Sequence, residues 1–287
     1  MVRKRGAAYP ASKAHEHNDM ALNTRLHQAF LQAQEGRLLP EIIPLSAVKN
    51  VLDLGCGAGD WIFQLARRYP HMHIYGIDYC EQALQEARVR YEISALRQVE
   101  LRQTDFLQAL STPDHYFDLV HMRRGAAFIT PEQWPKFIWE CTRTLKVGGW
   151  ITFVEFEVDE IASSACMELH RVTLQALRQL KLNMETTGMS YGAPQRLYSI
   201  LHQAPFDEIG YELYPADMGF LSGEAGQAFL AAMMSQFRQY KVQVVQLRFL
   251  SEKRFDALLA RAQQEIQAPD LCGWGTITTV YGRRSER

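Results

Sequence analysis

A short glycine-rich stretch, VLDLGCGAGD at residues 51–60, constrains the fold of this chain more than any other part of its sequence. An apolar run ends there, three glycines alternate with other residues, and a helix-forming stretch follows. Glycines in such a turn let the backbone bend tightly and approach a ligand closely. The pattern therefore predicts a buried strand, a ligand-binding turn and a helix, which is how an α/β nucleotide-binding fold begins.

The chain from about residue 49 to 156 alternates between strand and helix signals. Short apolar runs predict strands, and stretches rich in helix formers lie between them. Such alternation with short connections indicates a parallel sheet covered by helices on both faces. The predicted strands are 48–54, 73–77, 99–103, 117–122 and 150–156, and the predicted helices are 59–69, 80–95 and 131–145. Pro131 is expected to open its helix and Gly148-Gly149 to end it.

The two ends of the chain carry mostly helical patterns. The predicted helices there are 15–39, 160–183, 193–203 and 224–268, the last one broken near 249–251, and the predicted strands are 211–214 and 276–281. Because no repeat or low-complexity linker interrupts the chain, we expect a single domain over residues 1–287. Its expected parts are an N-terminal helical cap (1–45), a cofactor-binding core (46–160), helical lid and substrate-side elements (161–275), and a final strand with a tail (276–287).

Composition argues against several classes of protein. With 287 residues and 47% hydrophobic content the chain can bury a sizeable core, and a net charge of -1 gives no basic excess for nucleic acid. Five scattered cysteines without a CxxC pair fit reduced thiols. No signal-peptide pattern and no apolar run long enough to span a membrane occur. We therefore expect a cytoplasmic protein, a monomer or homodimer, with no nucleic-acid or membrane partner. The histidines and acids at 15–19 lack a metal-site framework, so no metal is expected.

The spacing of the glycine turn discriminates between nucleotide cofactors. A dinucleotide fingerprint, GxGxxG, needs glycine at position 60, where this chain has Asp60. A carboxylate there would also repel a pyrophosphate from the positive end of the helix. Asp53, two residues before the first glycine, can accept hydrogen bonds from a ligand ammonium. The turn therefore favours a nucleoside that carries an amino-acid group.

Further carboxylates follow the next two predicted strands. Asp78 ends the second strand, where its two oxygens can accept hydrogen bonds from the hydroxyls of a ribose. Asp105 follows the third strand and can accept from the exocyclic amine of adenine, while Phe106 can cover the ring. Asp118, at the start of the fourth strand, is expected to organise the preceding turn rather than contact a ligand.

With these motifs in order, the sequence resembles the class I S-adenosylmethionine-dependent methyltransferases, in their small-molecule branch. The matching stretches are VLDLGCGAGD, IYGIDYC, LRQTDF, FDLVHMR and LKVGGWITFVE. The resemblance covers roughly residues 10–160 well, and 195–215 and 275–283 more loosely. It implies an α/β, Rossmann-like seven-stranded sheet, mostly parallel with an antiparallel last strand, helices on both faces, and helical N-terminal and C-terminal caps.

The resemblance also implies the cofactor, S-adenosyl-L-methionine, its product S-adenosyl-L-homocysteine, and contacts from this chain. The implied contacts are Asp53, Gly55 and Gly57 for the methionine part, Asp78 for the ribose, Tyr79, Asp105 and Phe106 for adenine, and His121 under the sulfonium. Residues 19–28 are similar to an N-terminal helix with which some relatives close over the cofactor. There, Arg25 would pair with the cofactor carboxylate and Gln28 would hydrogen-bond it.

Methyl transfer makes few demands on catalytic side chains. The cofactor carries its own electrophile, so the protein mainly aligns the acceptor and excludes water. His121 and Glu155 are the catalytic candidates because both lie near the carboxyl ends of predicted strands, and Glu157 can share the side of Glu155. Other candidates are the pair Arg123 and Arg124, for an anionic acceptor, and Glu168, His170, Tyr191, His202 and Asp217 in the capping segments.

Motifs that this chain lacks reduce the number of possible classes of methyl acceptor. Asp118-Leu-Val-His121 stands where enzymes that methylate DNA adenine or protein glutamine carry an Asp/Asn-Pro-Pro-aromatic run. Methionines and aromatic residues after position 160 can line an adaptable apolar pocket, although such spacing is more often helix core. They are Met184, Met189, Met218, Met233, Met234, Tyr191, Phe220, Phe229 and Trp274. We therefore predict methylation of a small, partly apolar or aromatic metabolite at oxygen, nitrogen or carbon, by analogy in specialised metabolism.

Two other kinds of function stay open. The first is an S-adenosylmethionine-binding protein without transferase activity, in a regulatory or assembly role. The second is a different enzyme on the same sheet, an aminopropyl transferase or a nicotinamide oxidoreductase. The glycine spacing disfavours the oxidoreductase, and no paired acids that would hold a polyamine are evident.

Overall fold

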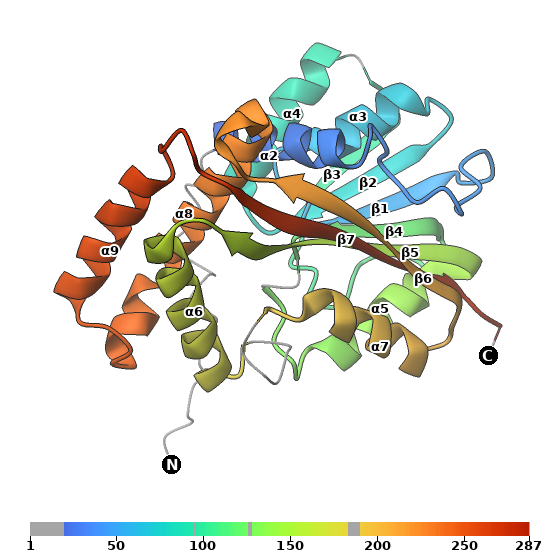
Figure 1. The fold of residues 1–287 in the computed structure, drawn as a ribbon. Coiled ribbons are helices and arrows are strands. Elements are labelled where there is room, and N and C mark those ends of the chain that lie inside the picture. The colour runs from blue at the N-terminus through green and yellow to red at the C-terminus, as the bar shows by residue number, and fades with distance from the viewer. Residues whose placement is uncertain (1–19, 95, 126–127, 183–189, 287) are drawn as a thin grey trace.

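A seven-stranded sheet forms the centre of the molecule (Figure 1). The computed structural model describes residues 20–286 except 95, 126–127 and 183–189. The strand order is β3-β2-β1-β4-β5-β7-β6, and β7 runs antiparallel to both of its neighbours. The strands are β1 (Asn50–Leu54), β2 (His73–Asp78), β3 (Val99–Gln103), β4 (Phe117–Arg123), β5 (Leu145–Ile161), β6 (Phe206–Asp217) and β7 (Gly273–Arg284). The predicted fold class, including the inserted antiparallel last strand, is confirmed.

Helices cover both faces of this sheet and one end of it (Figure 1). Buried side chains of α3 and α4 belong to one cluster with the sheet, and those of α5 and α7 to another cluster. A third cluster joins α2, α6, α8 and α9 to the ends of β5 and β7. The helices are α2 (Met20–Ala33), α3 (Asp60–Arg68), α4 (Glu81–Ser94), α5 (Trp134–Thr144), α6 (Ser164–Gln179), α7 (Ala193–Gln203), α8 (Gly223–Gln246) and α9 (Glu252–Glu265), with a 3-10 turn η2 (Phe220–Ser222).

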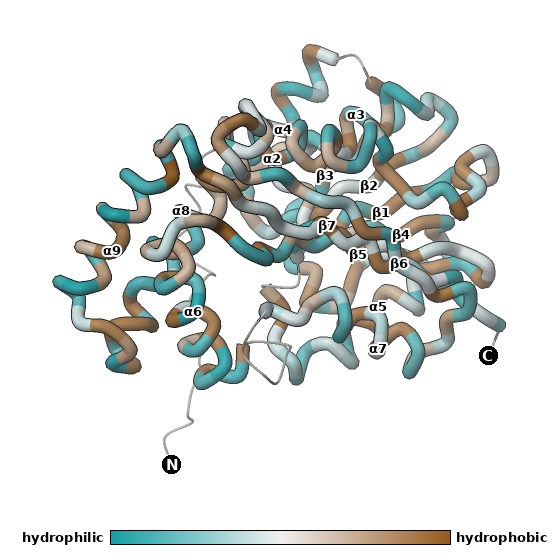
Figure 2. The backbone as a smooth tube through the Cα atoms, in the orientation of Figure 1, coloured by the Kyte–Doolittle hydropathy of each residue, from teal (hydrophilic) through white to brown (hydrophobic). Residues whose placement is uncertain are grey.

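The hydropathy of the chain follows this layering. In Figure 2, α6 and α9 alternate between brown and teal along their length, as helices with one buried face do. The long helical stretch after residue 223 is interrupted between α8 and α9, as the sequence predicts. Two aromatic contacts join α8 to α2 and to β5, because Phe229 of α8 lies 5.7 Å from Phe30 and 4.7 Å from Phe156 between ring centroids.

Several predicted boundaries are wrong, and most errors concern β5. The helix before it ends at Thr144, so β5 begins before Gly148-Gly149, which lie within the strand. Pro131 precedes α5 in a turn instead of opening it. At its far end β5 continues to Ile161, and α6 starts only at Ser164, where the Ser163 hydroxyl accepts a hydrogen bond from the backbone N–H of Cys166. Pairing with β7 over this length holds these residues extended and overrides their local helical pattern.

The register of the parallel strands brings their carboxyl ends to one edge of the sheet. Asp53 of β1 pairs with His121 of β4, and His121 with Thr152 of β5. Asp118 lies at the opposite edge, where its carboxylate accepts hydrogen bonds from the backbone N–H groups of Lys49 and Asn50. This agrees with the expectation that Asp118 organises a turn and does not contact a ligand. Ligands of open α/β sheets bind outside the carboxyl ends of the strands.

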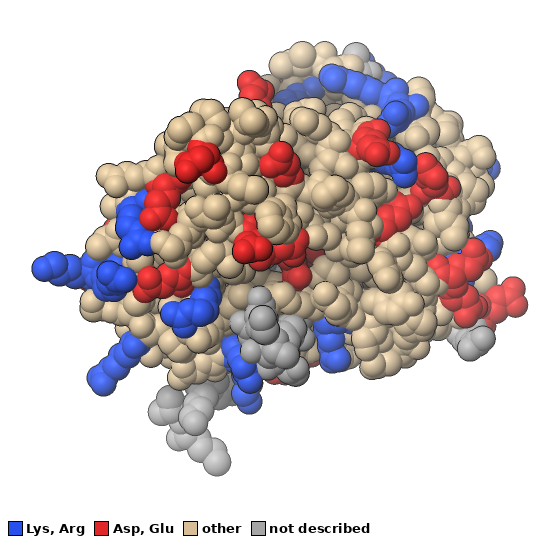
Figure 3. Space-filling view, in the orientation of Figure 1, with Lys and Arg blue, Asp and Glu red and all other residues tan. Residues whose placement is uncertain are grey.

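None of the helices in the described part of the chain is long and apolar enough to cross a membrane. On the face shown in Figure 3, acidic and basic side chains are interspersed among the described residues.

Candidate active site

A cavity of about 840 Å³ lies at the carboxyl edge of the sheet. Its walls come from α2, the turns after β1 and β2, the ends of β4 and β5, and the inner faces of α6 and α8. This volume lies toward the upper end of the range for small-molecule sites, so there is room for more than one small ligand. We call the part beside the turns after β1 and β2 the cofactor end, and the part beside α6 and α8 the acceptor end.

The glycine turn forms the floor of the cofactor end. Gly55, Gly57 and Gly59 have φ angles of 77°, 55° and 81°, a region that side-chain-bearing residues rarely adopt. A Cβ atom at Gly57 would meet nothing within 4 Å, so the space above it is open to a ligand. A Cβ at Gly59 would lie 2.6 Å from the Phe63 ring, so that glycine also serves packing.

Asp78 joins the two turns that border the cofactor end. One carboxylate oxygen accepts a hydrogen bond from the Gly57 backbone N–H at 2.9 Å, and the other from the Cys80 N–H at 2.8 Å. Burial raises the pKa of this carboxyl group, while the backbone hydrogen bonds lower it. Each oxygen keeps acceptor capacity for a second donor, so the carboxylate can hold the turns and a diol together.

Asp53 is the most deeply buried acid in this region. Only 4% of the residue is exposed, and no hydrogen bond or ion pair within the described part of the chain reaches its carboxylate. Burial raises its pKa to about 7, although Arg123 pulls the pKa down and Asp78 pushes it up. A buried carboxylate without a partner is costly, which is the pattern expected where a cationic ligand group binds.

His121 lies beneath the cavity in a tightly packed environment. Its ring stacks on Trp61 at 3.9 Å between centroids, and its Nδ1 lies 2.8 Å from the Thr152 hydroxyl. Among the described residues its Nε2 atom has no hydrogen-bond partner. Burial, followed by the charges of Arg123 and His27, holds its pKa well below the usual value. The ring is therefore neutral near pH 7 and a poor general base.

Most of the site residues predicted from sequence come together around this cavity. Its lining includes Asp53, Gly55, Gly57, Asp78, Tyr79, Asp105, Phe106, His121 and Glu155. Asp105 stands at the exposed rim, where its carboxylate also accepts from the Leu107 backbone N–H. Phe106 is buried against Phe137, with ring centroids 5.8 Å apart.

Arg25 and Gln28 are not brought to the cavity. Both side chains are exposed on α2, whose inner face carries Leu22, Leu26 and Phe30 at helical spacing. His27 lies on that inner face and lines the cavity, although the sequence analysis did not select it. The apolar spacing of the helix is the signal that would have found it, because His27 lies three positions before buried Phe30 and therefore on the same side of the helix.

The acceptor end is built from helical side chains and the end of β5. Gln236 of α8 donates a hydrogen bond to the Tyr191 hydroxyl at 3.2 Å, and Glu157 accepts one from the Ala193 N–H at 3.3 Å. His170 of α6 faces the same space, and burial lowers its pKa to about 4. The remaining lining of this end includes Arg124, Phe156, Val158, Met233, Gln239 and Tyr240.

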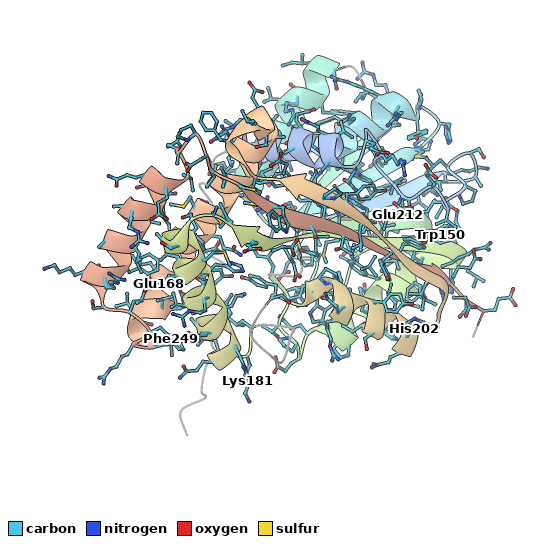
Figure 4. All side chains as sticks on the ribbon, viewed as in Figure 1. Trp150, Glu168, Lys181, His202, Glu212 and Phe249 are labelled. Atoms are coloured by element: carbon cyan, nitrogen blue, oxygen red, sulfur yellow. The ribbon has the colours of Figure 1, made fainter. Side chains whose placement is uncertain are left out.

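Other candidates from the capping segments lie away from the cavity. Glu168 on α6 pairs with Arg254, and His202 on α7 lies beside Tyr198 (Figure 4). Asp217 accepts a hydrogen bond from the Gly219 N–H. Met218, Met234 and Phe229 are core residues, whereas Phe220 and Trp274 are exposed. Met184, Met189 and the His15–Asp19 stretch lie outside the described residues, among which no cluster of three metal-binding side chains occurs.

Comparison with known proteins agrees with this geometry. Residues 51–149 match the family model of a methyltransferase domain. The chain is 23% identical to methyltransferase cpsF of Aspergillus campestris over 202 residues, which are 68% of this chain and 69% of that protein. It is 25% identical to secondary metabolism regulator LAE1 of Cochliobolus heterostrophus over 136 residues, which are 46% of this chain and 41% of that protein.

A solved structure shows the same fold. Phosphoethanolamine N-methyltransferase 2 of Haemonchus contortus, in complex with S-adenosyl-L-methionine, matches all of this chain and 62% of its own length with a TM-score of 0.57 and 16% identity. This chain therefore spans less than two thirds of that enzyme and of LAE1.

The fold and the site together define the class of protein. Residues 51–149 match a methyltransferase domain, and the chain shares its fold with an enzyme that binds S-adenosyl-L-methionine. The residues of this chain fit that cofactor, because a buried carboxylate without a partner faces the cavity and the space above Gly57 is open. The methyl acceptor does not follow from class membership, since one fold serves many acceptors.

Proposed function

We propose that this methyltransferase modifies a small, partly apolar or aromatic metabolite at an oxygen, nitrogen or carbon atom. The observation that carries the proposal is the acceptor end of the cavity, which continues from the glycine turn without a break. Its walls combine apolar surface from Phe156, Val158 and Met233 with polar groups from Gln236 and Tyr191. Such a mixture of apolar walls and a few polar groups suits a small organic acceptor.

The cofactor contacts expected from sequence belong to this proposal. They are Asp53, Gly55 and Gly57 for the methionine part, Asp78 for the ribose, and Tyr79, Asp105 and Phe106 for adenine, with His121 below. Their support is that all of them line one cavity at the carboxyl ends of neighbouring strands. The proposal does not include Arg25 and Gln28, because both side chains are exposed and neither lines the cavity.

The chain contributes to the transfer mainly by orientation. The bound cofactor supplies an activated methyl group, and aligning the two reactants can contribute about 7–11 kcal/mol. Glu155, 7% exposed at the end of β5, is the proposed group that positions the acceptor or takes its proton. His121 keeps the role of a cofactor contact, because its lowered pKa makes it a weak base.

Transfer of a labelled methyl group tests this proposal. The purified chain is incubated with methyl-labelled S-adenosylmethionine and fractionated small-molecule extracts, and products are identified by mass spectrometry. We expect labelled small molecules with the wild-type chain and none with Asp78→Ala. Binding of the cofactor without any labelled product would favour the alternative, a cofactor-binding protein in a regulatory or assembly role.

The proposal also covers where the protein acts in the cell, what it associates with, and how its chain divides into a core and caps. A cytoplasmic place fits the five cysteines, all of which are free thiols. We further propose a monomer or homodimer that acts without nucleic acid, in specialised metabolism, with the core at 46–160 and caps on either side. Light scattering and fractionation of the source cells would test these points.

A further inference from the structure

Two consecutive arginines at the end of β4 line the cavity, and they are held very differently. Arg123 donates a hydrogen bond from Nη1 to His27 Nδ1 at 2.9 Å, and its Cζ atom lies 5.4 Å from the centre of the Phe30 ring. The guanidinium of Arg124 makes no hydrogen bond or ion pair within the described part of the chain. Arg123 is therefore engaged by α2, whereas the five N–H donors of Arg124 are available to a ligand.

The backbone of Arg124 adopts a conformation that side-chain-bearing residues rarely have. Its φ angle is 56°, in the left-handed region, and its N–H donates a hydrogen bond to the Val154 carbonyl at 2.8 Å. Successive side chains of a strand point to opposite faces of a sheet, so a regular continuation of β4 would direct Arg124 away from the face of Arg123. With the left-handed residue in place, both side chains line one cavity. Backbone strain of this kind is typical of ligand-binding and active sites.

The positive charge of Arg124 is only partly balanced by its surroundings. Burial lowers the pKa of its guanidinium below the usual value, and the nearby charge of Glu155 offsets only part of this effect. An arginine side chain nevertheless stays protonated in a protein, so Arg124 is a permanent cation. Because the residue is exposed and lines the cavity, its charge can be reached by a ligand. A partly desolvated cation that lacks a full counter-charge is a binding position for an anion.

The position of Arg124 connects this cation to the acceptor end. Arg123 pairs with Val154 in the register of β4 and β5, so Arg124 comes beside Glu155, the group proposed to position the acceptor or take its proton. The lining continues from there along the apolar side chains of Phe156 and Met233. A ligand bound to Arg124 therefore has an apolar wall for its body and Glu155 close to its anionic end.

The charges of the acceptor end suit one negative charge better than two. Arg124 is the one lysine or arginine among the described lining residues of this end, where Glu155 and Glu157 are the acids. Glu157 accepts a hydrogen bond from the Ala193 N–H at the start of α7, where the helix dipole stabilises its charge. A phosphate group carries about −1.5 to −2 charges near pH 7 and would meet these acids with one cation to hold it. A carboxylate carries one charge, and its two oxygens match the planar arginine fork.

We propose that Arg124 binds a carboxylate of the methyl acceptor, so that the substrate is a small carboxylic acid with an apolar or aromatic body. The inference rests on the proposed function and adds the charge of the substrate to it. Arg124 thereby determines specificity, because its fork fixes the orientation of the acceptor with the nucleophilic atom toward Glu155. That atom forms a bond to the methyl carbon, the cofactor sulfur keeps the electrons of the broken carbon–sulfur bond, and Glu155 takes any proton released. The carboxylate is unchanged, so the product keeps its negative charge.

Titration with three small probes, followed by NMR, tests this site without requiring turnover. The chain is saturated with S-adenosylhomocysteine and titrated with benzoate, benzamide and phenyl phosphate, which share a phenyl ring and differ in charge. We expect the wild-type chain to bind benzoate at least about fivefold more tightly than either other probe. Arg124→Met should weaken benzoate binding about 10-fold and change benzamide binding less than about twofold. Arg124→Lys keeps the charge without the fork and should lose an intermediate amount.

Arg248 provides a matched control outside the cavity lining. It is exposed at a φ angle of 61°, and its guanidinium has no hydrogen bond or ion pair with any described residue. Arg248→Met removes the same charge from the same kind of backbone and should leave the affinity for all three probes unchanged. Glycine relieves left-handed strain, so Arg124→Gly and Arg248→Gly should each raise the melting temperature by about 2 °C. Of these two, Arg124→Gly alone should lose the preference for benzoate.

The charge of the methylated product is a second, independent measurement. Labelled products made by the wild-type chain should be retained on an anion exchanger at neutral pH and released at about pH 2, where a carboxylate is protonated. With the same substrate, Arg124→Met should raise KM about 10-fold and keep kcat within about threefold.

The outcomes separate failure of the site from failure of the proposed function. Equal binding of benzoate and benzamide by the wild-type chain, unchanged benzoate affinity in Arg124→Met, or a neutral product such as a methyl ester would overturn the carboxylate site. Tighter binding of phenyl phosphate than of benzoate would overturn the choice of a carboxylate. A preference for benzoate that depends on Arg124, together with no labelled product from any extract, would overturn the proposed function and leave Arg124 as an anion-binding residue. The comparison of benzoate with benzamide in the wild-type chain stands even if a variant does not fold.

Discussion

The two ends of the cavity are built by different means. The cofactor end consists of backbone turns and acids at the carboxyl ends of β1 and β2, where Asp78 binds the N–H groups of Gly57 and Cys80. The acceptor end consists of side chains from helices far apart in the chain, joined by contacts such as that of Gln236 with Tyr191. One end depends on local chain geometry and the other on long-range packing. Substitutions at the two ends should therefore have separable effects.

The largest effect is expected at Asp78. Asp78→Ala removes two charge-assisted hydrogen bonds to the turns as well as the proposed ribose contact, so the affinity for S-adenosylhomocysteine should fall about 100-fold or more. Asp118→Ala is the matched control, because Asp118 accepts from two backbone N–H groups at the opposite edge of the sheet. It should lower the melting temperature and leave calorimetric affinity within about threefold. Similar affinity losses in both variants would remove the distinction between the two edges.

The next effect concerns the left-handed backbone of the glycine turn. Gly57→Ala strains a residue at φ 55° and places a methyl group in the open space, so cofactor affinity should fall about 10-fold to 30-fold. Gly36→Ala imposes the same kind of strain at φ 81° with nothing within 4 Å, outside the cavity. Both variants should lose comparable thermal stability, and Gly57→Ala alone should lose affinity. An affinity unchanged in Gly57→Ala would mean that no ligand approaches this turn.

Cofactor binding should also depend on pH through Asp53. The pKa of its carboxyl group in the free protein is raised to about 7, chiefly by burial, and only the ionised form attracts an ammonium. S-adenosylhomocysteine should therefore bind roughly tenfold more weakly at pH 6 than at pH 7.5. The pKa values of His27, about 4, and Arg123, about 10, keep both groups in one form over this range. Asp53→Asn should remove this pH dependence, and a flat wild-type profile would contradict the assignment.

The smallest effects come from a pair of glutamines, one at each end. Gln64→Ala removes the acceptor that holds His27, so cofactor affinity should drop about threefold. Gln236→Ala removes a hydrogen bond at the acceptor end and should leave cofactor affinity within about twofold. Calorimetric titration of both variants with S-adenosylhomocysteine measures the two losses of affinity. Equal losses would show that the two ends are coupled through α2 and α8.

The same contrast explains what the sequence predicts well. The strand-turn-helix at residues 50–68 and the acids at 53, 78 and 105 could be predicted because spacing along the chain determines which residues reach the carboxyl edge of a parallel sheet. The inserted strand β7 followed from the family resemblance together with a β-branched stretch near the end of the chain. These features rest on local pattern and on a known topology.

The remaining parts depend on contacts that local pattern does not encode. Arg123 and His27 are 96 positions apart, and only the packing of α2 on the sheet brings them together. The expectation for Arg25 and Gln28 rests on the resemblance of residues 19–28 to a helix of some relatives, whereas the helical phase of this chain directs His27 inward instead. The full length of β5 likewise depends on pairing with β7, which overrides the glycines at 148 and 149.

Binding of S-adenosylhomocysteine to the wild-type chain tests the central claim most directly. Calorimetric titration is carried out with this ligand and, separately, with NADH. The geometry of the glycine turn and the buried Asp53 predict saturable one-to-one binding of S-adenosylhomocysteine and no binding of NADH. Binding of NADH without binding of S-adenosylhomocysteine would contradict the account.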